Sequence, residues 1–443
     1  MPAGADRCHQ LGETMNQCIA TATRRGLPGL VSLLSSLLLL SCGQRNGPQQ
    51  TATIRVGILH SRTGTMALSE ATVAEAERLA IEEINAAGGL KLNGRLVLVE
   101  PIEEDGMSDP AVFARKAQRM LNDDKAVAIF GGWTSASRKA MVPVMEASNR
   151  LLFYPVQYEG QECSPAVVYG GSVPNQQSEP ALGWMLNNHS KRLLLIGSDY
   201  VYPRTANRII RAQAEREQAR VLNEHYLPLG SEAVQPLIAD IQAALNAGPV
   251  AVVNTLNGDS NIAFFQALQR QGLNQRSALK VLSLSVSEEE AVAIGRRNIA
   301  GTYASWSYFQ SLQTPESAAF AQRFRQRYGF HRVINDPAEA GYSLVHLWAQ
   351  AVETSGSVET DAVRQALIGS RFTAPQGDLQ VSSSLHLKKR SLLAKADPKG
   401  GFRVLEDFGV IEPKPWNPAL PESAGATCDH RDAPPDQGVI PGG

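Results

Sequence analysis

The strongest constraint on the fold is a regular alternation of strand-like and helix-like segments in two successive parts of the chain. The first series predicts strands at 54–59, 96–100, 126–130, 151–154 and 167–169, with helices at 69–87, 109–123 and 135–148. The second predicts helices at 176–189, 203–219, 233–247 and 260–271 around strands at 192–197, 221–227, 250–255 and 280–285. Strands separated by helices form parallel sheets covered by helices. The prediction is therefore an α/β protein with two doubly wound lobes.

Chain length and a change of pattern near residue 301 predict how the lobes are divided. A chain of 443 residues is too long for one ordinary core, which favours two domains. Helical patterns at 315–328, 337–355 and 359–368 lead to antiparallel strand patterns at 377–410. This order suggests three crossings between lobes, near 171–175, 299–302 and 369–376. The predicted domains are 53–173 plus 301–369 for the first lobe, 174–300 plus 370–429 for the second, and a tail at 430–443.

The N-terminal segment has the pattern of a processing signal. Arg24 and Arg25 precede an apolar run at 30–40, which ends shortly before Cys42. The run has about half of the roughly 20 apolar residues that span a bilayer, so a cleaved signal over 1–41 is favoured over an anchor helix. The surroundings of Cys42 resemble the lipobox of bacterial lipoproteins, whose thiol is acylated. An ordinary secretory signal is the alternative.

These features predict a location outside the cytoplasm. Residues 42–52 are polar and are expected to be a flexible tether. The protein is then expected in the periplasm or at the cell surface, held to a bacterial membrane by a lipid on Cys42. Removal of the signal and acylation of Cys42 leave Cys163 and Cys428. A disulfide between them is predicted because thiols pair in an oxidising compartment, and two unpaired buried thiols are the alternative.

The motifs of common enzymes are missing from the sequence. It contains none of HExxH, CxxC, GxSxG, GxGxxG or GxxxxGK[ST], and its eight histidines are scattered. The protein is therefore predicted to be no enzyme and to use no cofactor or metal. The formal net charge of −1 argues against a nucleic-acid partner bound by electrostatics.

Two charged features could be mistaken for a functional site. His60 ends the first predicted strand, where open α/β sheets place ligand crevices. A capping or surface histidine is the favoured interpretation of His60. The acidic run of Glu288, Glu289 and Glu290 is predicted to be a solvated face.

Aromatic and mostly neutral polar side chains follow several predicted strands and form the candidate binding site. They are Trp133, Thr134, Ser135, Tyr154, Gln157, Tyr158, Asp199, Tyr200, Asn257, Asp259 and Trp306. A helix start offers unpaired N–H groups and hydroxyl donors for a carbonyl oxygen, and aromatic walls can sandwich a flat ligand. Helix capping by Thr134 or Ser135 is one alternative. Turn roles are the alternative for Asp199, Asn257 and Asp259.

Six segments resemble a known family over residues 53–429. They read GILHSRTGTMA at 57–67, AIEEINAAGG at 80–89, GGWTSASRKA at 131–140, YPVQYEGQECS at 154–164, GSDYVYPRTAN at 197–207 and LNGDSN at 256–261. They resemble the type I periplasmic binding proteins, and within them the substrate-binding component of urea ABC transporters. The resemblance implies two α/β lobes, three crossings and a ligand held between the lobes.

By this resemblance, the ligand residues fall on Trp133, Ser135, Tyr154, Gln157, Tyr158 and Tyr200, with Asn257, Asp259 and Trp306 also carried over. Aromatic and amide groups in the second motif favour a neutral ligand over a zwitterion. The implied function is capture of urea or a short neutral amide and its delivery to ABC permease subunits. The alternatives are a cytoplasmic amide-sensing regulator of the amidase-control type, a branched-chain amino-acid binding protein and an amidohydrolase.

Overall fold

The computed structural model describes residues 52–431, which belong to one compact unit, Thr51–Gly443. The predicted signal at 1–41, the lipid site at Cys42 and most of the tether at 42–52 lie outside the described residues, as does most of the tail at 430–443. No helix within 52–431 has both the length and the apolar character needed to cross a membrane.

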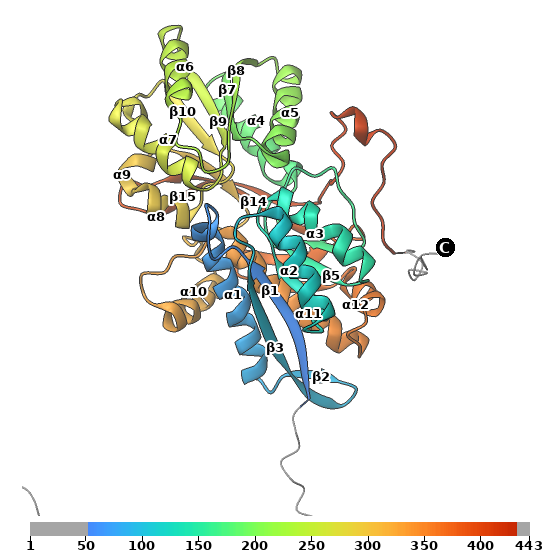
Figure 1. The fold of residues 1–443 in the computed structure, drawn as a ribbon. Helices are drawn as coiled ribbons and strands as arrows, with labels where there is room; N and C mark the ends of the chain where they lie inside the picture. The colour runs from blue at the N-terminus through green and yellow to red at the C-terminus, as the bar shows by residue number, and fades with distance from the viewer. Residues whose placement is uncertain (1–51, 432–443) are drawn as a thin grey trace, which may run out of the picture. The chain divides into compact units, whose positions relative to one another are not determined.

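The first sheet has the strand order β2-β3-β1-β4-β5-β6 (Figure 1). Its strands are β1 (Thr53–His60), β2 (Leu90–Leu92), β3 (Arg95–Asp105), β4 (Ala128–Gly131), β5 (Leu151–Tyr154) and β6 (Val167–Tyr169). All neighbouring strands are parallel except β2 and β3. β4, β5 and β6 are buried along their whole length. Continuous burial is typical of parallel strands covered on both faces.

Helices on the faces of this sheet complete the first lobe. They are α1 (Ala67–Ala86), α2 (Pro110–Asn122), α3 (Ser135–Ala147), α10 (Pro315–Tyr328), α11 (Asp336–Ser355) and α12 (Thr360–Leu367). α2 begins at Pro110 because the Asp109 side chain accepts a hydrogen bond from the Val112 N–H at 2.9 Å. α11 packs along α1, and its Trp348 meets Phe130 of β4 edge-on with ring centroids 5.8 Å apart. These helices therefore share one core with the sheet.

The second sheet forms most of the other lobe and has the strand order β8-β7-β9-β10-β11-β14-β13-β12, with β15 also on β14. β12 (Arg371–Ala374) and β13 (Gly377–Val381) extend it beyond β14. Its other strands are β7 (Arg192–Ser198), β8 (Arg220–Leu227), β9 (Val250–Thr255), β10 (Leu279–Ser283), β11 (Tyr303–Trp306), β14 (Leu387–Ala396) and β15 (Phe402–Ile411). Its helices are α4 (Ser178–Asn188), α5 (Val201–Arg216), α6 (Gln235–Asn246), α7 (Asp259–Arg270), α8 (Glu288–Ile294) and α9 (Arg296–Ile299). Short 3-10 helices occur at Pro174–Gln176, Leu273–Gln275 and Pro421–Ser423. The predicted fold of two α/β lobes is thus confirmed.

The lobes divide at positions that differ from those predicted at 301 and 369. β11 still belongs to the second sheet, where it pairs with β10 and β14, so the chain enters the first lobe after Trp306. The hairpin of β12 (Arg371–Ala374) and β13 (Gly377–Val381) packs its apolar side chains into the core of the first lobe. The chain therefore returns to the second lobe along β14, whose later residues join the second core.

A buried ionic cluster joins the three places where the chain crosses between lobes. Lys389 of β14 is fully buried, and its Nζ donates to Gly170 O at 2.7 Å. The Asp336 carboxylate accepts from the backbone N–H groups of Ser307 and Tyr308 at 2.9 and 2.8 Å. Burial lowers the pKa of Lys389 and raises that of Asp336, whereas their mutual attraction opposes both shifts. Direct hydrogen bonds therefore fix the first and third crossings to each other and the second crossing to α11, and the charges of Lys389 and Asp336 attract each other.

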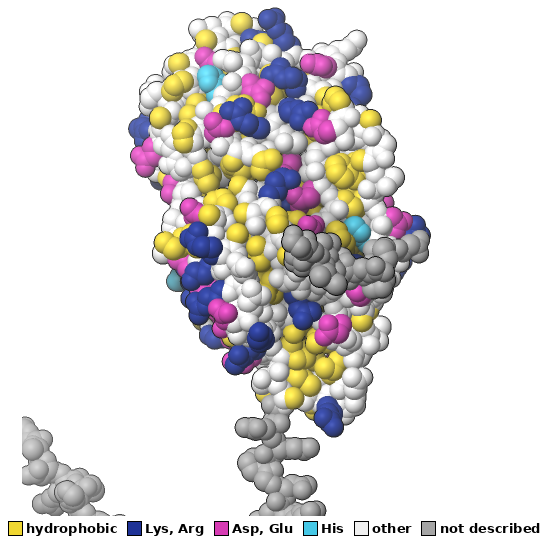
Figure 2. All heavy atoms as spheres, turned by 45° about the vertical axis from the view of Figure 1, so that its right-hand side comes forward, with side chains coloured by type: hydrophobic (Ala, Val, Ile, Leu, Met, Phe, Trp, Pro, Cys, Tyr) yellow, Lys and Arg dark blue, Asp and Glu magenta, His cyan; other side chains and the backbone are white. Residues whose placement is uncertain are grey.

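The surface carries both signs of charge. On the face drawn in Figure 2, basic and acidic side chains are scattered over the molecule and interspersed with apolar ones. This distribution fits the net charge of −1, and a mixed surface gives little long-range attraction for a polyanion.

Candidate functional site

Polar segments that follow strands of both sheets meet where the lobes touch. The Gln157 side-chain amide, after β5, donates to Leu284 O, after β10, at 3.1 Å. The backbone N–H of Asp259 donates to Thr65 Oγ1 of the first lobe at 3.2 Å. We call the side chains of Trp133, Gln157, Tyr200 and Tyr202, together with the groups that hold them, the inter-lobe site.

Glycine at the end of β4 allows the first of these segments to leave the sheet. Gly131 has a φ of +136°, and a Cβ there would lie 2.0 Å from Leu59 O of the neighbouring strand. Only glycine fits so close a backbone approach. The chain then places Trp133 in a position where its side chain is 3% exposed. The Trp133 indole Nε1 has no hydrogen-bond partner among the described residues.

Thr134 and Ser135 begin α3 and already have protein partners. Thr134 is the N-cap, and its Oγ1 accepts from the Ser137 N–H at 3.0 Å. Ser135 Oγ donates to Glu159 and accepts from Arg138 Nη1 at 3.0 Å. The single hydroxyl proton of Ser135 is therefore used within the protein. The role predicted for Ser135, donation to a ligand carbonyl, does not fit this geometry.

Arg138 forms a buried ionic cluster behind Ser135. Its guanidinium is 0% exposed and contacts Glu159 at 3.2 Å and Glu162 at 2.8 Å. Lys139 also pairs with Glu162, at 2.8 Å. Burial opposes ionisation of Glu162, but the neighbouring cations lower its pKa to about 2. The cluster therefore holds two cations and two carboxylates and leaves no unpaired charge for a ligand.

Tyr154 and Tyr158 are fully buried, and their hydroxyl groups point at protein partners. The Tyr154 hydroxyl donates to Trp133 O. The Tyr158 hydroxyl donates to His386 Nε2 at 2.5 Å, because the other ring nitrogen donates to Ser384 O at 2.7 Å. Burial lowers the pKa of His386 to about 3, so the ring is neutral. Arg138 lies over both tyrosine rings, 4.9 and 4.4 Å from their centroids, and both rings form the back of the site.

Gln157 and Tyr202 carry the other unpartnered buried groups of the inter-lobe site. Gln157 Oε1 and the Tyr202 hydroxyl have no hydrogen-bond partner among the described residues. Burial raises the pKa of Tyr202 well above its usual value, although the neighbouring Gln157 side chain lowers it and Glu159 raises it. Tyr200 is half-buried, with its ring centroid 6.3 Å from that of Tyr202. Burial raises the pKa of Tyr200, and Tyr202 and then Tyr154 of the first lobe add to the shift. The start of α5 thus lies against the first lobe, where α5 contacts α3.

The structure places four other candidates outside this group. Asp199 is exposed and pairs with Arg204 at 2.6 Å, and Asp259 is also exposed. Asn257 is buried, and its side chain donates to Thr255 O at 3.1 Å. Trp306 is 1% exposed in the core of the second lobe, where its Nε1 donates to Val286 O at 2.9 Å. Their hydrogen bonds correspond to turn or core roles.

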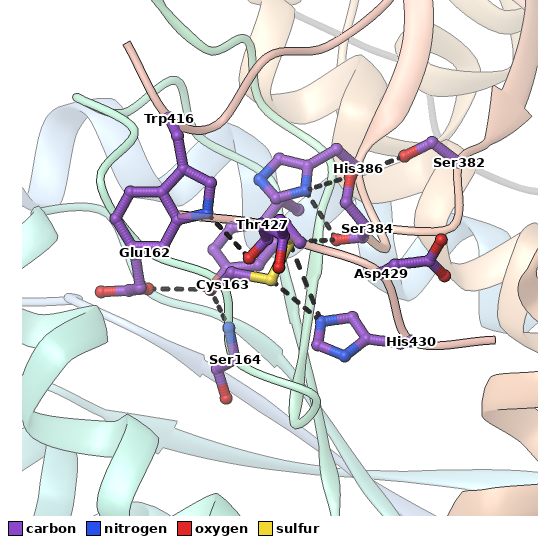
Figure 3. The surroundings of a disulfide bond; sticks show 12 residues. Glu162, Cys163, Ser164, Ser382, Ser384, His386, Trp416, Thr427, Asp429 and His430 are labelled. Carbon is purple, nitrogen blue, oxygen red and sulfur yellow. Dashed lines mark hydrogen bonds between the residues drawn. A yellow bond between two sulfur atoms is a disulfide. The ribbon is translucent and has the colours of Figure 1, made fainter. Parts of the chain in front are cut away.

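The structure contains a disulfide between Cys163 and Cys428, with Cα atoms 5.7 Å apart (Figure 3). His430 Nε2 lies 3.2 Å from the Cys163 sulfur. These three residues are the one group of three potential metal ligands found within 52–431. Because both sulfurs are bonded to each other, they are not thiolate ligands in this state. The bridge ties residues after β15 to the segment that carries Gln157.

The predictions for His60 and the acidic run were wrong. His60 is 2% exposed and its ring nitrogens contact Glu70 at 3.2 Å and Glu77 at 3.0 Å. The acidic run is buried at the start of α8, where this helix packs against α1 and α7. The Glu290 carboxylate accepts a hydrogen bond from the Ser287 hydroxyl at 2.6 Å, which caps the start of the helix. Pattern alone could not reveal that a short helix with three acidic residues lies between other helices.

We expect the His60 cluster to make stability depend on pH. Burial lowers the pKa of His60, but Glu77 and Glu70 outweigh it and raise the value from 6.5 to about 9. The folded state therefore holds a proton that the unfolded chain releases above about pH 6.5. The proton's contribution to stability is fully present below pH 6.5 and is lost as the pH rises to 9. The free energy of unfolding should fall by about 2–3 kcal/mol between these pH values. The pKa of Glu77 is also raised by burial, which acts in the same direction.

Guanidinium unfolding at pH 6.5 and pH 9 measures this effect. His60→Gln should flatten the difference between the two pH values, whereas His331→Gln, at an exposed histidine, should leave it unchanged. An equal pH dependence in His60→Gln and the parent protein would contradict the assignment.

The fold and the site together define a class of protein. Two α/β lobes with unpartnered polar groups between them have the architecture of a two-lobed ligand-binding protein. The family model described as "Periplasmic binding protein domain" matches residues 54–422. The chain therefore belongs to the periplasmic binding protein family, which confirms the prediction at the level of this family.

Curated relatives match to different extents. Leu/Ile/Val-binding protein homolog 6 of Brucella melitensis is 21% identical over 353 residues, covering 78% of this chain and 88% of that protein. Limonene hydroxylase of Geobacillus stearothermophilus is 28% identical over 127 residues. That match covers 29% of this chain and spans only 23% of the hydroxylase.

Solved structures share the fold at low identity. A solute-binding protein of an ABC transporter from Rhodopseudomonas palustris, in complex with p-hydroxybenzoic acid, has a TM-score of 0.73 at 22% identity, covering 82% of this chain and 98% of that one. A branched-chain amino acid transporter substrate-binding protein from Streptococcus pneumoniae, in complex with isoleucine, has a TM-score of 0.68 at 17% identity, covering 82% of this chain and 100% of that one.

Proposed function

We propose that this protein is the solute-binding component of an ABC transporter and that its ligand is urea or another short neutral amide. Relatives with the same fold are named as solute-binding proteins of ABC transporters, which supports the transport role. The resemblance of the strand-end segments to urea-binding proteins supports the ligand class. The protein would bind its ligand without catalysing a reaction.

The observation that carries the ligand class is the combination of paired charges and unpaired neutral groups. Arg138 is neutralised by Glu159 and Glu162, so a ligand carboxylate would find no free cation there. Three buried groups of the inter-lobe site form no hydrogen bond of normal geometry with the described residues: the indole N–H of Trp133, the amide oxygen of Gln157 and the hydroxyl of Tyr202. The Gln157 side chain and the Tyr202 hydroxyl lie close enough to influence each other, so a ligand between them would take up both groups. An unpaired buried polar group is costly. An amide supplies a carbonyl oxygen for the donors and an N–H group for the acceptor.

Transport would follow from closure of the lobes on the ligand. Trp133 packs in the core of the first lobe and Tyr202 belongs to α5 of the second, so a small molecule held between them would contact both lobes. A ligand that binds the closed form better raises the population of that form. The permease would then recognise the closed form. The signal and the lipid on Cys42 would place the protein outside the cytoplasm, at the membrane that holds the permease.

We expect Trp133→Ala to weaken urea binding by about 1–3 kcal/mol, because it removes a buried aromatic contact and an N–H donor. Calorimetric titration of the purified variant with urea measures the change. Trp184→Ala is the matched control, since Trp184 is partly exposed and its Nε1 donates to Glu406 at 3.2 Å. Unchanged urea affinity in folded Trp133→Ala would show that Trp133 has only a core role.

A further inference from the structure

A cavity lies beside α8, and none of its lining residues belongs to the inter-lobe site. Its volume is about 520 Å³, which falls in the range of pockets that hold small molecules. The walls come from α8 and α9, from residues 310–311 with Val333, and from the turn at 397–403 between β14 and β15. Segments far apart in the sequence thus enclose one space.

The cavity has an apolar side. Ala291, Ile299 and Phe402 line it and are buried. Val292 also lines it and is 61% exposed at its edge. An exposed valine beside buried apolar groups provides a surface on which the hydrocarbon part of a ligand can pack.

The other side of the cavity is basic. Arg296, Lys399 and Arg403 line it, and none of the three forms a salt bridge within residues 52–431. The carboxylate of Asp397, also on the wall, accepts from the backbone N–H of Lys399 at 2.7 Å. Cations therefore outnumber anions around this space, which favours an anionic ligand.

Arg296 is held in place by the turn between β14 and β15. Its Nη1 donates to Lys399 O at 3.0 Å. Gly400 has a φ of +106°, and a Cβ at this position would lie 2.7 Å from Arg296 Nε. The glycine therefore lets the guanidinium lie directly against the turn, and the side chain keeps further N–H donors for a ligand.

Glu288 adds an unpartnered buried group to the wall. Its side chain is 4% exposed, and Oε1 accepts from the Gln310 N–H at 2.8 Å. Oε2 has no hydrogen-bond partner among the described residues. Burial raises the pKa of Glu288 to about 8, so at neutral pH the group is mainly protonated and adds no negative charge.

We propose that this cavity is a second ligand site, which binds a small organic carboxylate with an apolar body. Arg296 and Arg403 would pair with the carboxylate, since guanidinium groups bind carboxylates through charge-assisted hydrogen bonds. Ile299 and Phe402 would contact the apolar body. The ligand is chemically distinct from the neutral solute of the inter-lobe site, so both sites can be filled at once.

Phenylacetate is a suitable probe because it joins a carboxylate to an aromatic ring. Calorimetric titration of the full protein should give saturable binding of one phenylacetate, unaffected by saturating urea and weakened by added salt. The double variant Arg296→Gln/Arg403→Gln should bind it at least about tenfold more weakly. Arg297→Gln is the matched control, because Arg297 is exposed next to Arg296 and does not line the cavity.

Several outcomes would overturn this proposal. They are no saturable binding at millimolar phenylacetate, displacement of phenylacetate by urea, equal affinity in the double variant, or equal loss in Arg297→Gln. Thermal unfolding of the double variant checks that it is folded. The urea titration of the same samples is a separate result, so the two ligand sites succeed or fail independently.

Discussion

Arg138→Met is expected to lower the free energy of unfolding by about 3–5 kcal/mol, the cost of removing one partner from a buried ion pair. The guanidinium is fully buried and contacts Glu159 and Glu162. Methionine fills part of the space but leaves Glu159, which is 1% exposed, without its cation. Guanidinium unfolding measures the loss, and this denaturant is preferable because urea is the proposed ligand.

The neighbouring Lys139 provides a matched control for Arg138. Lys139 pairs with the same Glu162 but is 39% exposed, so Lys139→Met should change stability by no more than about 1 kcal/mol. Adding Glu159→Gln to Arg138→Met should recover part of the loss, since the unpaired carboxylate is then removed. Equal effects of Arg138→Met and Lys139→Met would contradict the proposed importance of the buried pair.

Arg138→Met should also weaken ligand binding. Arg138 donates hydrogen bonds to both Ser135 and Glu159. Trp133 lies two positions before Ser135, the first residue of α3. If the cluster positions this segment, urea affinity should fall in folded Arg138→Met even though Arg138 contacts no unpartnered group of the site. Unchanged affinity would limit the role of Arg138 to stability.

The double variant Cys163→Ser/Cys428→Ser is expected to be about 2–5 kcal/mol less stable than the parent protein, the usual range for loss of a native disulfide. The bridge joins residues 265 positions apart, so it restricts a long loop in the unfolded chain. In the folded state, Pro415 O also accepts from the Gln161 N–H at 2.7 Å, and Ser383 O from the His430 N–H at 2.8 Å. These hydrogen bonds would remain in the variant.

A reductant provides the control for the disulfide. It should destabilise the parent protein by a similar amount and leave the double serine variant unchanged. Labelling of thiols in the native, unreduced protein should find Cys163 and Cys428 blocked. Two free thiols in that state would show that the bridge does not form in solution.

The fold could be predicted well from the sequence because its signals are local. Alternating strand and helix patterns with glycine and proline at their ends specify βαβ units, and connection handedness limits their arrangement. The exact crossings could not be predicted in the same way. β11 is a short strand of aromatic and small residues, and its pattern does not reveal which sheet it joins. Its pairing with β10 and β14 depends on distant segments.

The segments of the inter-lobe site could be predicted, but the role of each side chain could not. The positions of Trp133 and Gln157 after predicted strands led to their prediction as site residues, and both carry unpartnered groups. Tyr158 and Trp306 have the same aromatic character, yet His386 and Val286 take up their polar atoms. These hydrogen-bond partners lie far away in the sequence. The sequence therefore does not distinguish an aromatic residue that lines the site from one that belongs to the core.

Two residues of the site region were missed by the sequence reasoning. Arg138 lies three positions after Ser135, which places it one helical turn further along α3. Tyr202 lies two positions after Tyr200, at the start of α5. Both stand inside segments already recognised as candidates. The prediction included the hydroxyl residues of the first segment but not its cation, Arg138. In the second segment it included Tyr200 but not Tyr202.

A calorimetric titration of the purified protein with urea, acetamide and leucine in parallel tests the proposed ligand class. We expect saturable binding of urea or acetamide at one site per chain, weakened in Trp133→Ala, and no binding of leucine in the same concentration range. Saturable binding of leucine with none of urea or acetamide would contradict the neutral-amide ligand. Release of ammonia from urea during the titration would instead show an enzyme.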